Sequence, residues 1–166
     1  IEENLSLAHS RTTVGPLSFA PSKKEIALFR DRLAEFGMGL EDRMKTKVGL
    51  LSGGQRQAVT LLMCTIVPPQ LLLLDEHTAA LDPATAEKVM DITRRVVAQY
   101  NLTTLMITHN MRAALTTGTR TIMMDEGRIL FDLKGEEREK TTLDDLLQMY
   151  SARKNKDFAN DRMLLD

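Results

Sequence analysis

The stretch LSGGQRQ at residues 51–57, followed by LLLLDEHTAALDP at residues 71–83, decides the fold of this 166-residue chain. In the first stretch, Ser52 precedes an apolar helical run and Gln55 stands three residues further on, which is the spacing of a capping box. The second stretch opens with a short, continuous apolar run that ends on two acids, a pattern typical of a strand covered on both faces. A capped helix followed by such a strand indicates an α/β protein.

The two glycines after Ser52 require a reason. A helix capped by Ser52 places Gly53 and Gly54 on its first turn, where backbone N–H groups have no partner within the helix. Each glycine costs about 1 kcal/mol of helix stability relative to alanine. Close approach of an anionic group to the positive helix end is one reason for that cost, and a capped helix with a glycine-rich entry is the plainer alternative. The motif by itself leaves both open.

The acids after the strand suggest a second kind of chemistry. At the carboxyl end of a strand in an open α/β sheet, Asp75 is suited to hold Mg²⁺ and Glu76 to polarise an attacking water. His109 follows the next predicted strand, TTLMIT at residues 103–108. If the two strands are neighbours, His109 stands on the same sheet edge as the acids. A strand that ends in a polar turn, and a histidine in a loop, are the alternatives.

The sequence on either side of these motifs predicts further helices and strands. A helix begins after Ser22, whose capping box Glu25 completes, and ends at Gly37. The helix after Ser52 is apolar nearly all round, which indicates burial, and ends at Pro68. The next predicted helix is capped by Asp82, has Pro83 in its first turn and runs to Tyr100. The strand at 103–108 and a short helix at 109–118 follow it. The remaining predicted elements are two antiparallel strands within 121–133 around Glu126 and Gly127, and a last helix at 141–150 before a charged tail at 151–166.

Composition excludes some classes of protein. The formal net charge of −1 gives no electrostatic argument for nucleic acid or an anionic membrane as a partner. No apolar run reaches the roughly 18 residues of a membrane span. The one cysteine, Cys64, cannot form an internal disulfide, and its apolar surroundings favour a role as core filler over a role as nucleophile. The first residue is not methionine, so we expect the natural beginning to lie upstream.

Taken together, the motifs resemble those of the ATP-binding cassette (ABC) ATPases, the nucleotide-binding subunits of ABC transporters. LSGGQRQ is similar to the signature motif of that family, LLLLDE to its Walker B strand and catalytic glutamate, TAALD to its D-loop, and MITH to its switch histidine. The resemblance runs from Ile1 to about residue 133. It implies an α/β fold with a partial P-loop NTPase core, which is a mainly parallel sheet with flanking helices, plus an all-helical signature subdomain. The implied parts are a helical subdomain at 1–67, the second portion of the ATPase core at 68–133, and a C-terminal helix and tail at 134–166.

The resemblance also implies roles for single residues. Asp75 would orient Mg²⁺, Glu76 would be the general base, and His109 would contact the γ-phosphate. The residues that would bind or link ATP sites across a dimer of two ATPase subunits are Ser52, Gly53, Gly54, Gln55 and Asp82. The implied cofactors are ATP and Mg²⁺, and the implied partners are a second ATPase subunit and transmembrane permease subunits, with no nucleic acid. The implied location is the cytoplasm, at the inner face of the cell membrane, and the pattern is closest to importers of small organic solutes such as amino acids.

Two departures from the family pattern stand out. His77 occupies a position where the family has proline, and the sequence assigns its imidazole no role. The phosphate-binding pattern G-x-x-x-x-G-K-[ST] (Walker A) does not occur in the chain, so the resemblance is to the C-terminal portion of an ABC ATPase. We therefore expect the chain by itself to be inactive.

Three alternatives to a transporter subunit remain from the sequence. A soluble ABC ATPase of DNA repair would carry long coiled coils before the signature, and the residues ahead of it show no sustained heptads. An ABC protein of translation would carry two cassettes and a basic linker. A non-catalytic interaction module would retain the fold without needing Glu76 and His109.

Overall fold

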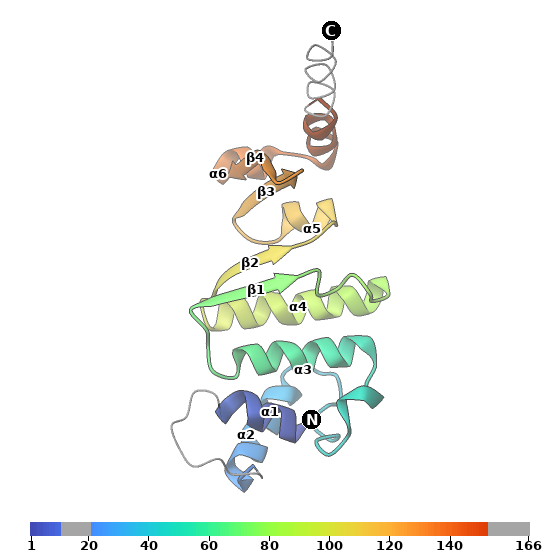
Figure 1. Cartoon of the computed structure of the whole chain (residues 1–166), viewed down its shortest axis with the longest axis vertical. Coiled ribbons are helices and arrows are strands. Elements are labelled where there is room, and N and C mark those ends of the chain that lie inside the picture. The colour runs from blue at the N-terminus through green and yellow to red at the C-terminus, as the bar shows by residue number, and fades with distance from the viewer. Residues whose placement is uncertain (11–20, 153–166) are drawn as a thin grey trace. The chain divides into compact units, whose positions relative to one another are not determined.

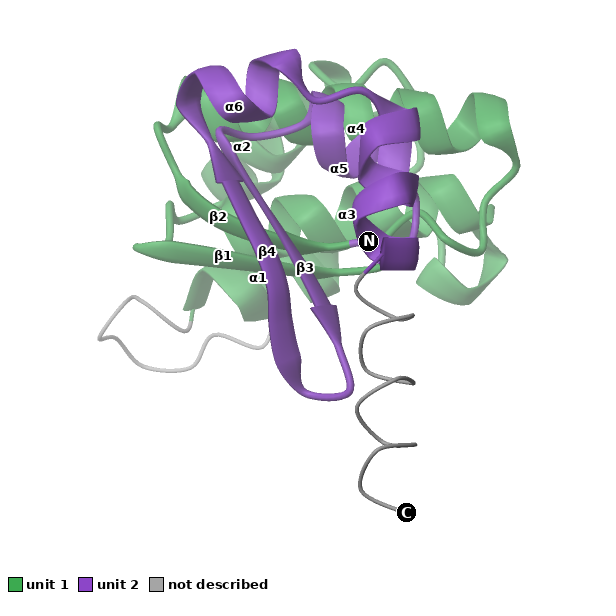
Figure 2. Ribbon diagram, turned by 90° about the horizontal axis from the view of Figure 1, so that it is seen from above, with its two compact units in different colours: residues 1–107 green, residues 108–166 purple. Residues whose placement is uncertain are grey.

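The computed structural model describes residues 1–10 and 21–152, and these residues fall into two compact units, the first ending at Ile107 and the second beginning at Thr108 (Figure 2). Each unit is described by itself. The first unit joins the predicted helical subdomain to the first part of the predicted ATPase core, and the predicted three-part division stays a prediction. No helix within the described ranges combines the length and apolar character that crossing a membrane requires.

The helices of the first unit begin where the sequence places their caps. They are α1 (Glu2–Ser10), α2 (Lys23–Ala34), the short 3₁₀ helix η1 (Val48–Leu50), α3 (Gly53–Thr65) and α4 (Pro83–Gln99). Ser22 and Ser52 each form a complete capping box, and Asp82 caps α4 with Pro83 in the first helical position. These three predictions are confirmed. Neither α1 nor η1 was predicted.

Helix α3 is the centre of the first unit, because α1, α2 and α4 all pack against it (Figure 1). The hydrophobic core includes Phe29 and Leu33 of α2, Leu62 of α3 and Ile92 of α4, each almost fully buried. Side chains of α4 also bond the carbonyl groups at the end of α2. Lys88 Nζ lies 2.8 Å from the Gly37 carbonyl oxygen. These contacts fasten α4 to the helical part of the chain.

One prediction about α3 is wrong. The sequence indicated a helix buried nearly all round, with Cys64 in the core, but Cys64 is exposed. Thr60 and Arg56, one and two turns earlier, are exposed as well. Their spacing of four residues gives α3 a narrow solvent-facing stripe, and Cys64 lies at its end. The packing of α1, α2 and α4 around α3 leaves this stripe uncovered.

The sheet of the first unit has two parallel strands, β1 (Leu71–Asp75) and β2 (Thr103–Ile107), joined through α4. Their register pairs Leu71 with Thr103 and Asp75 with Ile107. The prediction that β1 is covered on both faces is wrong for this chain. Leu72 is 3% exposed, whereas Leu73 is 64% exposed. The helices of the first unit cover one face, and the apolar side chains on the other face are exposed, namely Leu71, Leu73, Leu105 and Ile107.

The second unit is built on an antiparallel hairpin of β3 (Arg120–Asp125) and β4 (Arg128–Lys134), with α5 (Met111–Thr116) before it and α6 (Gly135–Lys140) after it. Glu126 and Gly127 form the turn with φ of 47° and 75°, as a two-residue hairpin requires, so the predicted strand pair is confirmed. A further helix runs over 143–152, close to its predicted place. Helix α6 was not predicted, and most of the predicted charged tail, 153–166, lies outside the described residues.

Candidate functional site

The start of α3 carries the first group of candidate residues. The Ser52 hydroxyl oxygen accepts a hydrogen bond from the Gln55 backbone N–H at 3.3 Å, and Gln55 Oε1 accepts one from the Ser52 backbone N–H at 3.2 Å. The Ser52 side chain is exposed, so its hydroxyl proton can still be donated outward. The capping box therefore fixes Ser52 at the positive end of α3 and leaves a donor there.

The Gln55 side chain has a second task that the sequence did not reveal. Its Nε2 donates to the Met38 carbonyl oxygen at 3.2 Å, and Arg43 Nη1 donates to its Oε1 at 3.2 Å. Gln55 thus ties the start of α3 to the loop between α2 and η1. Both the oxygen and the nitrogen of its amide are hydrogen-bonded within the chain, so Gln55 is suited to support the start of the helix.

The structure supplies a third reason for the two glycines. A β-carbon on Gly53 would lie 2.9 Å from Leu81 Cδ2, and one on Gly54 would overlap the methyl group of Thr85. Leu81 and Thr85 flank the first turn of α4, so α3 and α4 meet at their N-terminal ends. Glycine is required at position 54 because α4 comes this close. Sequence reasoning could not find this contact, since it depends on how the helices pack.

These contacts place the start of α4 next to the start of α3. Asp82 Oδ1 accepts a hydrogen bond from the Thr85 backbone N–H at 3.1 Å. Hydrogen bonding by the Thr85 side chain, and then by its backbone N–H, holds the pKa of Asp82 below its ordinary value. The structure therefore brings Gly53 and Gly54 together with the segment that Asp82 caps.

The second group of candidate residues lies where β1 ends. Asp75 is the last residue of β1, and Glu76 continues the pairing, because its backbone N–H donates to the Ile107 carbonyl oxygen at 3.0 Å. Both carboxylates are exposed. Glu76 has a φ of 42°, a left-handed conformation that costs a non-glycine residue roughly 1–2 kcal/mol. Strain of this kind at a strand end is characteristic of functional sites.

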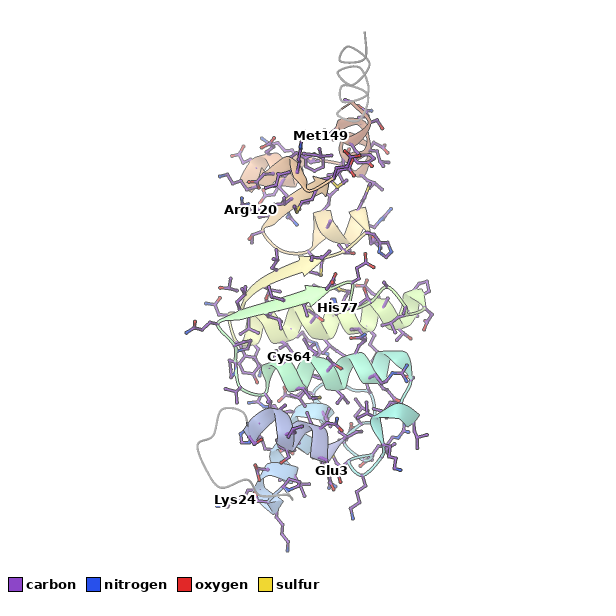
Figure 3. The ribbon with its side chains drawn as sticks, viewed as in Figure 1. Glu3, Lys24, Cys64, His77, Arg120 and Met149 are labelled. Atoms are coloured by element: carbon purple, nitrogen blue, oxygen red, sulfur yellow. The ribbon has the colours of Figure 1, made fainter. Side chains whose placement is uncertain are left out.

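His77 is half-buried directly after Glu76, beside the end of β1 and over α4 (Figure 3). Its Nε2 lies 3.2 Å from Thr93 Oγ1 on α4. Burial lowers the pKa of the His77 imidazole from its ordinary value. Sequence reasoning assigned no role to this side chain, and the structure shows that it contacts α4.

His109 belongs to the second unit, two residues after the end of β2. It is exposed and immediately precedes Asn110, which caps α5 by accepting a hydrogen bond from the Ala113 backbone N–H at 3.0 Å. The pairing of β1 with β2 confirms that the two strands are neighbours. That His109 joins Asp75 and Glu76 stays a prediction.

The residues at the end of β1 fit a magnesium ion by their chemistry. Mg²⁺ keeps several waters and binds through one or two carboxylates together with substrate phosphates. Asp75 and Glu76 offer such carboxylates, exposed and adjacent. Among the described residues no cluster of three or more His, Cys, Asp or Glu side chains could hold a metal ion by itself. The donor set suits an ion that arrives with a polyphosphate.

Comparisons with known proteins show which proteins this chain resembles. The family model described as ABC transporter matches residues 2–79. The chain is 40% identical over 150 residues to the tyrosine transport ATP-binding protein of Clostridioides difficile (strain R20291), a match that covers 90% of this chain and 59% of that protein. It is 36% identical over 152 residues to a methionine import ATP-binding protein of Bacillus thuringiensis subsp. konkukian (strain 97-27), covering 86% of this chain and 44% of that protein.

A solved structure shows the same likeness in three dimensions. An ATP-binding cassette in a dimeric post-hydrolysis state, bound to ADP and Pi, superimposes with a TM-score of 0.64 at 27% sequence identity, covering 80% of this chain and 55% of that one. The chain spans about half the length of the curated relatives it matches. In the part that it covers, the chain has the fold of the P-loop NTPase core, and it matches the C-terminal part of the ATPases of ABC transporters.

Proposed function

We propose that this chain forms the part of an ABC importer ATPase that activates the attacking water and contacts the ATP bound to a partner subunit. The observation that carries the proposal is the end of β1, where the exposed carboxylates of Asp75 and Glu76 stand at the carboxyl edge of a parallel sheet. Open α/β sheets bind their ligands at this edge. The named relatives transport tyrosine and methionine, which supports an amino acid or similar small solute as cargo.

Each acid has its own task in the proposed reaction. Bound Mg²⁺ would neutralise charge on the phosphates of ATP. Asp75 would hold that ion, usually through its water shell, because a short carboxylate at the strand end presents a hard oxygen ligand. Glu76 would take the proton of the attacking water, since an ionised carboxylate is purely an acceptor. His109 would contact the γ-phosphate.

The start of α3 would serve the ATP held by a second subunit. The Ser52 hydroxyl and the backbone N–H groups of Gly53 and Gly54 would donate to its γ-phosphate, because these donors lie at the positive end of α3. Gln55, whose amide is bonded within the chain, would support the helix start. Asp82, next to the contact between α3 and α4, would link the two ATP sites. The dimeric ADP-bound relative supports such an assembly.

The same proposal predicts where the protein works and that ATP binding depends on segments this chain lacks. The partners would be a second ATPase subunit and membrane permease subunits, at the cytoplasmic face of the cell membrane. The 166 residues contain no phosphate-cradling loop with its lysine. We therefore propose that this chain alone binds ATP more weakly than about 1 mM, which corresponds to only some 4 kcal/mol. Saturable micromolar binding in a fluorescent-ATP titration would contradict this.

The decisive experiment is Glu76→Gln in the longer protein that supplies the phosphate-binding loop. The amide keeps the shape of the side chain but cannot accept a proton, so hydrolysis should fall by about 10²–10⁴ while ATP binding persists. Glu87→Gln, an exposed glutamate on α4, is the matched control and should leave both unchanged. Near wild-type turnover by Glu76→Gln would show that Glu76 is not the base.

A further inference from the structure

Glu76 holds a backbone conformation that needs support. In the described part of the chain, two other non-glycine residues have a positive φ, Asn101 and Glu126. Asparagine tolerates this conformation, and Glu126 lies in the tight turn between β3 and β4. Neither explanation applies to Glu76, which is not an asparagine and does not lie in the turn of a hairpin. Neighbouring contacts must therefore hold it there.

The peptide groups of Glu76 itself supply two of these contacts. Its N–H donates to the Ile107 carbonyl oxygen at 3.0 Å, and its carbonyl oxygen accepts from the Ala79 N–H at 3.0 Å. A third contact comes from the next residue, because His77 Nε2 lies 3.2 Å from Thr93 Oγ1. The third contact is the one that reaches across to α4.

Thr93 is a fixed anchor for that contact. Its side chain is buried, and its hydroxyl donates to the Val89 carbonyl oxygen at 2.9 Å. A hydroxyl has one proton, so toward His77 the Thr93 oxygen can only accept. The hydrogen therefore resides on Nε2 of His77, which donates. Because the neighbouring Ile92 and Val96 belong to the hydrophobic core, Thr93 moves only if α4 moves.

We propose that His77 is a positioning residue for Glu76. Its hydrogen bond to Thr93 fixes the peptide that follows Glu76 and so keeps the Glu76 backbone in the left-handed conformation. The catalytic consequence rests on the proposed role of Glu76 as general base, whereas the hydrogen bond between His77 and Thr93 is present in this chain whatever its activity. Loss of that hydrogen bond would let the Glu76 backbone relax while β1 and α4 stay folded.

Amide hydrogen exchange of the whole 166-residue chain, followed by NMR, tests the tie directly. His77→Phe and Thr93→Val remove the hydrogen bond, whereas His77→Gln and Thr93→Ser keep a donor or an acceptor in place. We expect the Glu76 amide to exchange roughly three- to tenfold faster in the first pair, relative to the amides in the middle of α4. The second pair should stay within about twofold of wild type.

Ile92→Val is the matched control, because it trims the core beside Thr93 without touching the hydrogen bond. It should accelerate exchange at Glu76 and in α4 by the same factor. The variants of His77 and Thr93 would give this same uniform acceleration if their hydrogen bond served only general stability. Equal acceleration at both places in His77→Phe and Thr93→Val would overturn the proposal.

Steady-state kinetics of the longer ATPase give the catalytic readout. His77→Phe should lower kcat at least threefold with KM unchanged, and His77→Gln should restore most of it. Unchanged kcat in His77→Phe, despite faster exchange at Glu76, would also overturn the proposal. If the wild-type longer protein hydrolysed no ATP, the proposed function would fail, and the exchange result would still decide whether His77 holds Glu76.

Discussion

Gly54 of α3 and Thr85 of α4 touch so closely that no β-carbon fits between them. The contact joins the first turns of the two helices, one capped by Ser52 and the other by Asp82. It explains the glycine without a ligand, since the space that a side chain would occupy is filled by the Thr85 methyl group. It also makes the spacing of the two helix ends sensitive to a single methyl group on either side.

Gly54→Ala should therefore destabilise the chain although alanine favours helices. Overpacking costs about 1–3 kcal/mol, against a gain of about 1 kcal/mol from helix propensity. Urea unfolding measures the net loss. Adding Thr85→Ser removes the methyl group and keeps the hydroxyl, so the double variant should recover most of the loss. Gly49→Ala, where an added β-carbon meets nothing within 4 Å, is the control and should lie within about 0.5 kcal/mol of wild type.

Gln55→Ala should cost more stability than Glu25→Ala, although each removes one capping box. Glu25 has one further contact, because its Oε1 lies 3.3 Å from His9 Nδ1 at a part-buried position. Gln55→Ala additionally removes the hydrogen bonds of Gln55 with Met38 and Arg43, each of which contributes about 0.5–1.5 kcal/mol. Chemical denaturation of both variants compares the losses. Equal losses would show that the bonds to the loop before η1 add nothing.

Cys64 should react with a maleimide in the folded chain as completely as in urea, because its side chain is exposed. Mass spectrometry of the labelled chain measures the extent. A matched control is Thr65→Cys in a Cys64→Ser background, since Thr65 is 2% exposed and a thiol there should label only after unfolding. Labelling of Cys64 that required urea would place it in the core after all.

His77 should make stability depend on pH below about 6.5. Burial lowers its folded pKa below the unfolded value of about 6.5, so between these two values the unfolded chain binds more protons than the folded one. Stability should therefore rise with pH through this window and become flat above it. NMR titration of the imidazole gives the folded pKa directly, and denaturation across the window gives the slope. His77→Gln should remove this part of the slope, and an unchanged slope in that variant would assign it to other groups.

The parts of the structure that follow from the sequence are those with local signals. The capping boxes at Ser22 and Ser52, the Asp82–Pro83 start of α4 and the turn at Glu126 and Gly127 depend on hydrogen bonds or dihedral angles within a few residues. Sequence reasoning reads such signals directly. It also placed Asp75 and Glu76 at the end of a strand in a parallel pair, as the structure shows.

What sequence reasoning missed depends on packing between distant segments. Cys64 was assigned to the core because its neighbours are apolar, yet the helices around α3 leave its stripe uncovered. Leu73 was assigned to a covered face for the same reason. The contact of Gly54 with Thr85 and the bond of His77 to Thr93 join residues whose spacing carries no local pattern. Such features emerge only once the helices are packed.

The parallel pairing of β1 with β2 through α4 has a consequence for the order of folding. The paired residues are far apart in the chain, as Leu71 and Thr103 are, and parallel pairings of this kind form slowly because the loop between the strands must close first. The bond from the Glu76 N–H to Ile107 forms in the same closure. The turn that carries Asp75 and Glu76 is therefore completed only when α4 has packed and the two strands have paired, so its geometry is among the later features of the fold to form.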